Sequence, residues 1–224
     1  MCGRYAITLP PEAMANLFGS SDRPNLPPRY NVAPTQSVPM VAVGKAGDRR
    51  IVMARWGLRP GWMEKDPPTG PLFNARSETV AEKPSFRTAF ARHRCLIPAD
   101  GFYEWQREGK ARIPHFIHRT DGTTAAFAGL WAQAPQPDAP PLISCTIVTT
   151  AAAPDFTALH DRFPVVLEPE AWGLWLDPAT PPQVLHQLIR APAPGVMRAY
   201  RVSDLVGKVA NDGPELLHPV QALL

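Results

Sequence analysis

The chain has 224 residues, of which 45% are hydrophobic and 19% are charged, as is usual for a globular protein. This length can bury one sizeable core, so a single domain over residues 1–224 is expected. The net charge of +3 is too small to require a polyanionic partner. Most basic residues are Arg, however, which suits bidentate phosphate contacts and stacking on bases.

Several classes of protein are disfavoured at once. The N-terminus lacks a basic segment followed by an apolar run, and no apolar stretch approaches about 18 residues, so a soluble intracellular protein is expected. Cys2, Cys95 and Cys145 are an odd number, lie far apart and form no CxxC pair. This spacing argues against both a disulfide framework and a zinc site, and it leaves room for a free, reactive thiol.

In chain order, the first predicted element is a helix over residues 11–18, with Pro at its first turn and Gly19 just past its end. A second helix is predicted over residues 84–92, where Phe86 and Phe90 share one face. Two more follow at residues 169–176 and 182–189. Short apolar or alternating runs predict strands at residues 38–43, 50–56, 101–106, 113–118, 125–131, 143–149 and 165–167. The pattern indicates an α+β protein: a single domain with a mostly antiparallel, barrel-like sheet and flanking short helices.

The N-terminus carries the first candidate for chemistry. A Met followed by a small residue is expected to be removed, which would leave Cys2 as an N-terminal 1,2-aminothiol. The amine has a pKa of about 8, so a useful fraction is neutral at pH 7. It can attack an aldehyde to form a Schiff base, and the thiol can then close a five-membered thiazolidine ring. Taken alone, a Cys at position two can equally be chance.

Residues 73–79 form a second polar cluster, in which Asn74 and Arg76 stand close to two hydroxyl residues and an acid. Such a segment is often only a helix cap or a turn. An amide beside a guanidinium would also suit a deoxyribose and its phosphate.

Residues 97–105 form a third cluster. Strand alternation would place Glu104 on the same face as Phe102 and opposite Tyr103 and Trp105. A carboxylate among aromatic side chains is a candidate for a raised pKa and acid–base work, although it could also lie on an exposed strand edge.

A fourth cluster comprises Thr149 and Thr150 followed by residues 159–164, where His160 precedes an acid and a base. A lone His is more often structural than catalytic, and the other five His residues show no metal-ligand spacing with it. We therefore interpret His160 as an acid–base or hydrogen-bonding group. No metal and no cofactor are expected, because no phosphate-cradling Gly-rich loop or flavin fingerprint occurs.

Together these segments closely resemble the SRAP family, the SOS response-associated peptidase-like proteins that process abasic sites. The resemblance covers nearly the whole chain and rests on segments at residues 1–5, 29–36, 55–58 with Pro60 and Trp62, 74–79, 98–105, 128–131, 160–162 and 209–212. Eight segments in the same order are highly specific.

The resemblance implies a barrel-like core, a positively charged groove and a covalent crosslink between Cys2 and an abasic site in single-stranded DNA. Asn74 would hold Cys2 and the opened sugar, Glu104 would shuttle protons, and His160 would assist ring opening and reversal. The implied DNA contacts are Arg4, Arg76, Trp105, Thr149, Arg162, Trp62 and Pro39. A monomer is expected, in the cytoplasm and on the nucleoid when bound to DNA, with crosslinking or lyase-type activity.

Two other functions remain open from the sequence. Cys2 with His160 and either Asn74 or Glu104 could form a cysteine peptidase, whose action could be limited to the removal of Met1. Alternatively, the polar clusters could bind damaged DNA without reacting with it.

Overall fold

The computed structural model describes residues 2–220; Met1, whose removal the sequence predicts, lies outside them, as do residues 221–224. The strands are β1 (Tyr5–Ile7), β2 (Arg29–Val32), β3 (Ser37–Val43), β4 (Arg49–Trp56), β5 (Asn74–Arg76), β6 (Arg94–Ala99), β7 (Gly101–Glu108), β8 (Ala111–Arg119), β9 (Ala125–Gln136), β10 (Ala139–Ala151), β11 (Arg162–Pro164) and β12 (Met197–Arg201). The α-helices are α1 (Pro11–Phe18), α2 (Arg87–Arg92), α3 (Pro169–Leu176) and α4 (Pro182–Leu188). Within the described residues there are also the short 3₁₀ helices η1 (Pro154–Phe156), η2 (Asp204–Gly207) and η3 (Pro214–Leu217).

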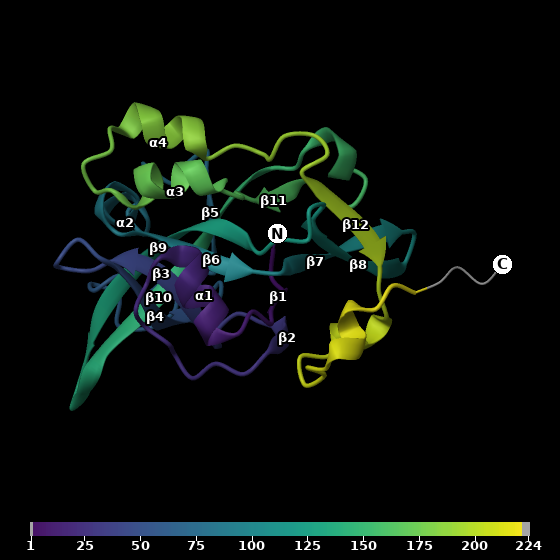
Figure 1. The fold of residues 1–224 in the computed structure, drawn as a ribbon, viewed down its shortest axis with the longest axis horizontal. Helices are drawn as coiled ribbons and strands as arrows, with labels where there is room; N and C mark the ends of the chain where they lie inside the picture. Colours follow the sequence, from purple (N-terminus) through teal and green to yellow (C-terminus); the bar gives the residue numbers. More distant parts are fainter. Residues whose placement is uncertain (1, 221–224) are drawn as a thin grey trace.

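Strands β3, β4, β6, β9 and β10 form a closed ring, because β10 pairs with β4 on one side and with β9 on the other. Strand β10 pairs in parallel with β4 and with β5, whereas the other strand pairings of the ring are antiparallel. The long hairpin of β9 and β10 extends beyond the ring (Figure 1). The predicted α+β class with a mostly antiparallel, barrel-like sheet is therefore confirmed.

A second sheet has the order β12, β8, β7, β1 and β2, and all its pairings are antiparallel. Side chains alternate along β7 as predicted, and the structure places the two faces of this strand in two separate cores. Phe102 contacts Phe127 and Phe163 in the main core, whereas Tyr103 packs with Phe116 in a smaller core under the C-terminal segment. Glu104 therefore lies on the Phe102 side of β7.

Helices α2, α3 and α4 lie together beside the ring, whereas α1 lies apart from them (Figure 1). Arg94 on β6 fixes α2 and α3 to the sheet. Its guanidinium, which is almost fully buried, donates to the carbonyl oxygens of Phe90, Ala91, Trp175 and Asp177 at 2.5–2.7 Å. These are carbonyls at helix C-terminal ends, which lack partners within their own helix and favour a cation.

Among the predicted elements, one helix and one strand are misplaced. The helix predicted over residues 84–92 begins only at Arg87, because Phe86 has a φ of −121° that does not continue a helix. The strand predicted at 165–167 is displaced: β11 ends at Pro164, and Val166 forms only an isolated bridge with Phe127. The backbone N–H groups on either side of this bridge still bond to neighbouring strands: Val165 donates to the Val148 carbonyl and Leu167 to the Ala126 carbonyl, both at 2.9 Å.

The C-terminal segment that contains η2 and η3 is fastened to β2 by Asn31 and Asp212. The buried Asn31 amide donates to the carbonyl oxygens of Val206, Lys208 and Asn211 at 2.7–3.2 Å. The Asp212 carboxylate accepts from the backbone amides of residues 30 and 31 and from the Arg29 side chain. A segment with little regular structure is thereby held in one position.

Replacing this amide should destabilise the protein. We expect Asn31→Ala to lower the free energy of unfolding by about 2–4 kcal/mol, because three backbone carbonyls lose their donor inside the protein. Urea denaturation measures the change. Asn25→Ala is the matched control, because Asn25 is exposed, and it should change stability by less than about 0.5 kcal/mol. Equal effects of the two substitutions would contradict this role for Asn31.

Candidate functional site

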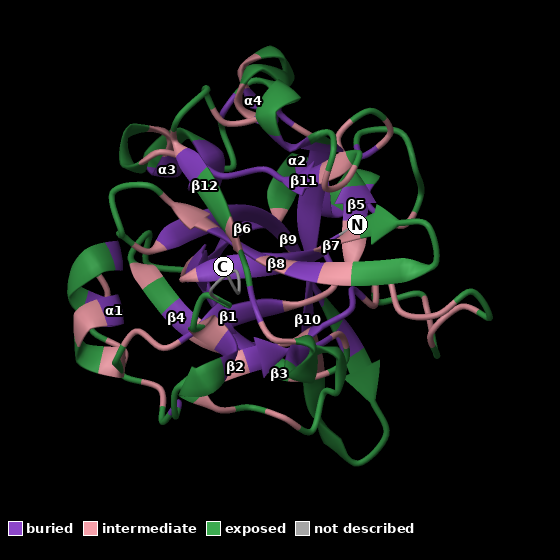
Figure 2. Ribbon diagram, turned by 90° about the vertical axis from the view of Figure 1, so that its right-hand side faces the viewer, coloured by how far each residue is buried: buried purple, intermediate pink, exposed green. Residues whose placement is uncertain are grey.

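Four residues expected to act together come from four separate parts of the chain. Cys2 lies three residues before the start of β1, Asn74 opens β5, Glu104 lies within β7, and His160 lies just before β11. Figures 1 and 2 show β5, β7 and β11 gathered in one region of the molecule. Two side-chain pairs, Asn74 with Cys2 and Glu104 with His160, define the site.

Cys2 is completely buried, and its backbone is held by Asn74. The Asn74 side-chain Nδ2 donates a 2.7 Å hydrogen bond to the Cys2 carbonyl oxygen. The other side-chain atom, Asn74 Oδ1, is also buried and accepts no hydrogen bond from any residue between 2 and 220. A buried acceptor of this kind is suited to a donor supplied by a ligand.

The thiol of Cys2 is held in its protonated form. Burial raises the pKa of the Cys2 thiol well above its ordinary value, and the negative charge of Glu104 raises it further. The influence of Glu104 on the thiol connects the Cys2–Asn74 pair with the Glu104–His160 pair. Cys95 and Cys145 are also free and buried, and burial raises the pKa of each.

Glu104 is almost fully buried, with 4% of its surface exposed. Burial raises the pKa of its carboxyl group to about 7. At neutral pH the group is therefore divided between its acid and base forms, as a general acid–base catalyst requires. The sequence also allowed Glu104 to lie on an exposed strand edge, and that alternative is wrong.

His160 presents its Nε2 to Glu104, with 3.8 Å between Nε2 and Oε2. The backbone amide of Arg162 donates to Nδ1 at 2.9 Å, and the Oδ1 of Asp161 is also 2.9 Å from Nδ1. In a neutral ring, Nδ1 cannot both accept a hydrogen bond from the Arg162 amide and donate one to the Asp161 carboxylate. The backbone amide is fixed, whereas the Asp161 side chain is largely exposed, so the proton belongs on Nε2. Partial burial lowers the pKa of His160, which keeps the ring neutral at pH 7.

Arg4 links β2 to the C-terminal segment and also lines a cleft. Its guanidinium donates to the Asn31 side chain at 2.8 Å and to the Val206 carbonyl at 2.7 Å, and it lies 5.8 Å from the centre of the Trp105 ring. These bonds fix the position of the charge beside Trp105.

Arg162, expected to contact phosphate, is engaged by protein groups. It forms a two-pronged ion pair with Glu78, and it also donates to the carbonyl oxygen of Thr149. The hydrogen bond from Arg162 lowers the pKa of Glu78. A phosphate at Arg162 would have to compete with this carboxylate. The Thr149 side chain is buried and accepts a 3.3 Å hydrogen bond from Arg162.

The remaining predicted DNA contacts differ in exposure. Arg76 is exposed, and 65% of the Trp62 surface is exposed. Trp105 is half-buried and lines two clefts. Pro39, by contrast, is buried in the middle of β3, opposite Met53, and offers no surface for stacking. Pro39 is therefore not among the DNA contacts that we propose.

Arg107 was missed by the sequence analysis. It lines the same cleft as Trp105, His160 and Asp161. Its signal in the sequence is its position two residues after Trp105, which alternation places on the same face of β7.

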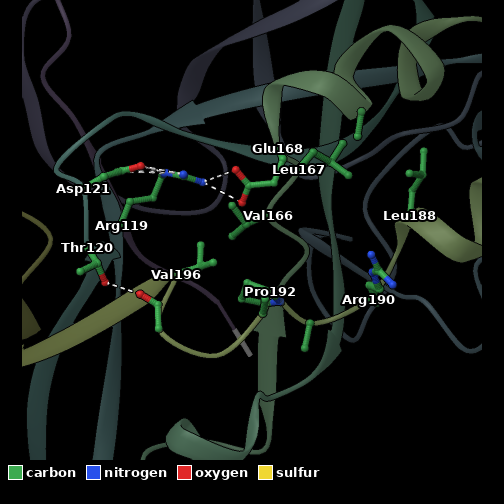
Figure 3. A pocket seen from close by; sticks show the side chains of 14 residues that line it. Arg119, Thr120, Asp121, Val166, Leu167, Glu168, Leu188, Arg190, Pro192 and Val196 are labelled. Atoms are coloured by element: carbon green, nitrogen blue, oxygen red, sulfur yellow. Dashed lines mark hydrogen bonds and ion pairs between the residues drawn. The ribbon is translucent and has the colours of Figure 1, made fainter.

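A larger cavity of about 520 Å³ lies elsewhere, between α3, the end of α4 and the start of β12. Arg119 lies there between Asp121 and Glu168, and it bonds to both carboxylates (Figure 3). These three charges therefore satisfy one another and stabilise the wall of the cavity. Within residues 2–220, His, Cys, Asp and Glu side chains nowhere gather in threes as a metal site would need.

The fold and site together define a small barrel protein with a buried cysteine near its N-terminus. The family model for SOS response associated peptidase (SRAP) matches residues 1–209. The chain therefore belongs to the SRAP family, which confirms the resemblance drawn from its motifs.

Relatives in bacteria and vertebrates carry the name abasic site processing protein. YoqW of Bacillus subtilis (strain 168) is 37% identical over 222 residues, which cover 97% of this chain and 99% of the relative. YedK of Escherichia coli (strain K12) is 32% identical over 231 residues, covering 98% of this chain and 100% of the relative. HMCES of Gallus gallus is 31% identical over 267 residues, covering 99% of this chain and 78% of the relative.

Solved structures show the same fold. An X-ray structure of a Bacteroides thetaiotaomicron protein has a TM-score of 0.88 at 24% identity, covering 98% of this chain and 100% of that one. A phage-related protein from Bordetella bronchiseptica has a TM-score of 0.73 at 29% identity, covering 90% of this chain and 94% of that one. Among the helices of residues 2–220, none has the length and apolar character needed to cross a membrane.

The raised pKa of Glu104 should make stability depend on pH. Because the folded-state pKa is about 7 against an ordinary 4.5, ionising the carboxyl group costs the folded protein stability as pH rises between these values. We expect the free energy of unfolding of the unsubstituted protein to fall by on the order of 3 kcal/mol between pH 4.5 and 7, and Glu104→Gln to remove this fall. Urea unfolding of both proteins across this range measures the difference, and parallel pH profiles would contradict the buried carboxyl.

Proposed function

We propose that this protein processes abasic sites in single-stranded DNA by forming a covalent bond through Cys2. The observation that carries the proposal is the buried Cys2 whose carbonyl is held by Asn74 and whose thiol lies under the influence of Glu104. The names of the relatives supply the substrate class. Removal of Met1 would supply the free amine that the reaction needs.

The proposed chemistry begins when the abasic sugar opens to its aldehyde. The Cys2 amine attacks C1′ and forms a carbinolamine, which loses water to become an imine. The thiol then adds to the imine carbon while its proton moves to the nitrogen, which closes a thiazolidine ring. No oxidant or reductant is consumed.

The protonation states of the site suit this sequence of steps. Glu104, with a pKa near 7, can release a proton for the loss of water and accept one afterwards. A proton on His160 Nε2 can be donated to the sugar ring oxygen as the ring opens. The buried Oδ1 of Asn74 can accept a hydrogen bond from a sugar hydroxyl or from the amine.

The Cys2 thiol should determine whether the DNA strand is cleaved at the abasic site. We expect Cys2→Ala to abolish a heat-stable adduct with a single-stranded oligonucleotide that carries one abasic site. Cys2→Ser keeps the amine but loses the thiol, so it should give less stable adduct and more strand cleavage by β-elimination. Denaturing gels measure both products, and mass spectrometry establishes the removal of Met1 in each protein.

Undamaged DNA and Cys145→Ala serve as controls, because the Cys145 thiol is buried elsewhere in the core. Absence of an adduct from protein with a free Cys2 amine would contradict the proposal. Peptide turnover without DNA would instead favour a cysteine peptidase, and DNA binding unaffected by Cys2→Ala with no adduct would favour a noncovalent reader.

Asn74 should affect the rate rather than the presence of the adduct. Asn74→Asp keeps the shape but removes the donor to the Cys2 carbonyl, and we expect adduct formation to slow about tenfold or more. Single-turnover kinetics at saturating DNA measure this effect. A rate equal to that of the unmodified protein would show that the bond does not position the reacting residue.

A further inference from the structure

The end of the β7–β8 hairpin carries two arginines directly opposite each other. Arg107 on β7 pairs with Arg112 on β8, and Trp105 pairs with Pro114 two positions earlier. Because cross-strand partners point to the same side of a sheet, Trp105, Arg107 and Arg112 share one face. With Arg4, which lies 5.8 Å from the Trp105 ring, they form what we call the hairpin face.

Like charges directly opposite on paired strands reduce stability. Both Arg107 and Arg112 are exposed, and neither makes a hydrogen bond or ion pair with any residue in the described part of the chain. Arg4, by contrast, is held by bonds to Asn31 and Val206. The hairpin face therefore contains positive charge that serves no evident purpose in folding.

Two clefts meet at Trp105. One, of about 430 Å³, is also lined by Arg107, Leu159, His160 and Asp161, so it opens directly onto the proposed reaction site. The other, of about 460 Å³, is lined by Arg4, Trp105, Arg112, Asp204 and Gly207. A ligand that runs from His160 across Trp105 would thus pass Arg107 and then Arg112.

We propose that the hairpin face binds the backbone of single-stranded DNA on one side of the reacting nucleotide, with Arg107 and Arg112 as phosphate contacts and Trp105 as a stacking surface. This inference rests on the proposed function and assigns a path for the strand beyond the reaction site. An aromatic side chain flanked by guanidinium groups is the combination that binds single strands without reading their sequence. A phosphate between the two arginines also relieves their mutual repulsion.

Binding should be measured without the covalent reaction, so that the two proposals can fail separately. The parent protein carries Cys2→Ala, and the probe is an undamaged, fluorescently labelled single-stranded oligonucleotide. Anisotropy titrations over a range of salt concentrations compare this parent with the double variant Arg107→Gln, Arg112→Gln. The matched control is Lys45→Gln with Arg190→Gln, which removes the same charge from exposed positions that line neither cleft.

We expect the hairpin variant to bind at least tenfold more weakly at low salt. Its slope of log affinity against log salt concentration should fall by about 1.4, since each phosphate contact on a single strand contributes about 0.7. The control variant should keep the parent slope, and the melting temperature of the hairpin variant should not fall. An unchanged slope, or an equal change in the control, would overturn the proposal.

A second measurement identifies the side of the strand. Protein with Cys2 intact is reacted with abasic oligonucleotides that extend only 5′ or only 3′ of the abasic site. The hairpin variant should reduce adduct yield with one of the two substrates and leave the other unchanged. Equal loss with both would overturn the assignment to one side, whereas no adduct from any protein would overturn the covalent function and leave the binding test valid.

Discussion

The hydrogen bond from Asn74 to the Cys2 carbonyl is the contact on which the proposed chemistry depends. Residues near a chain end are usually frayed, because ordering each one costs about 1–2 kcal/mol of conformational entropy. Here the chain is fixed three residues after Cys2, where β1 begins and pairs with β2 on one edge and with β7 on the other. Asn74 extends this order to Cys2 itself. A reaction that closes a ring on one residue needs its amine and thiol held in one orientation, and a frayed terminus would not provide it.

Burial then determines which chemistry the site favours. A peptidase of the cysteine type needs a thiolate, commonly stabilised by a protonated histidine. Burial disfavours both charged forms here, since it raises the pKa of Cys2 and lowers that of His160. Glu104 lies close to the balance between its two forms at neutral pH. A neutral thiol with a nearby carboxyl group that exchanges protons suits addition to an imine better than attack on a peptide bond.

The sequence predicts the central strands and helices well where a pattern repeats over several residues. Helices α1 and α3 agree with their predicted limits, because proline marks where each begins. Strands β1, β5 and β11 have only three residues each, too few for alternation to be visible, and they exist because the long β10 and the second sheet supply partners. The contact between Cys2 and Asn74 depends on β5, so no local pattern could have predicted it. The motifs nevertheless identified both residues through family resemblance.

The arginines illustrate a second limit of the sequence. Arg4 and Arg162 stand in motifs that suggest phosphate contacts, yet each donates to several protein groups within the fold. Arg107 and Arg112 stand in no motif, yet the hairpin register places them opposite each other, and neither forms an ion pair with another residue in the described part of the chain. A guanidinium that already bonds a carboxylate offers less attraction to a phosphate than one that does not, because the new bond replaces an old one. The modest net charge of +3 therefore conceals a local concentration of available positive charge beside the reaction site. Local availability of this kind, rather than total charge, would determine which way a bound strand runs.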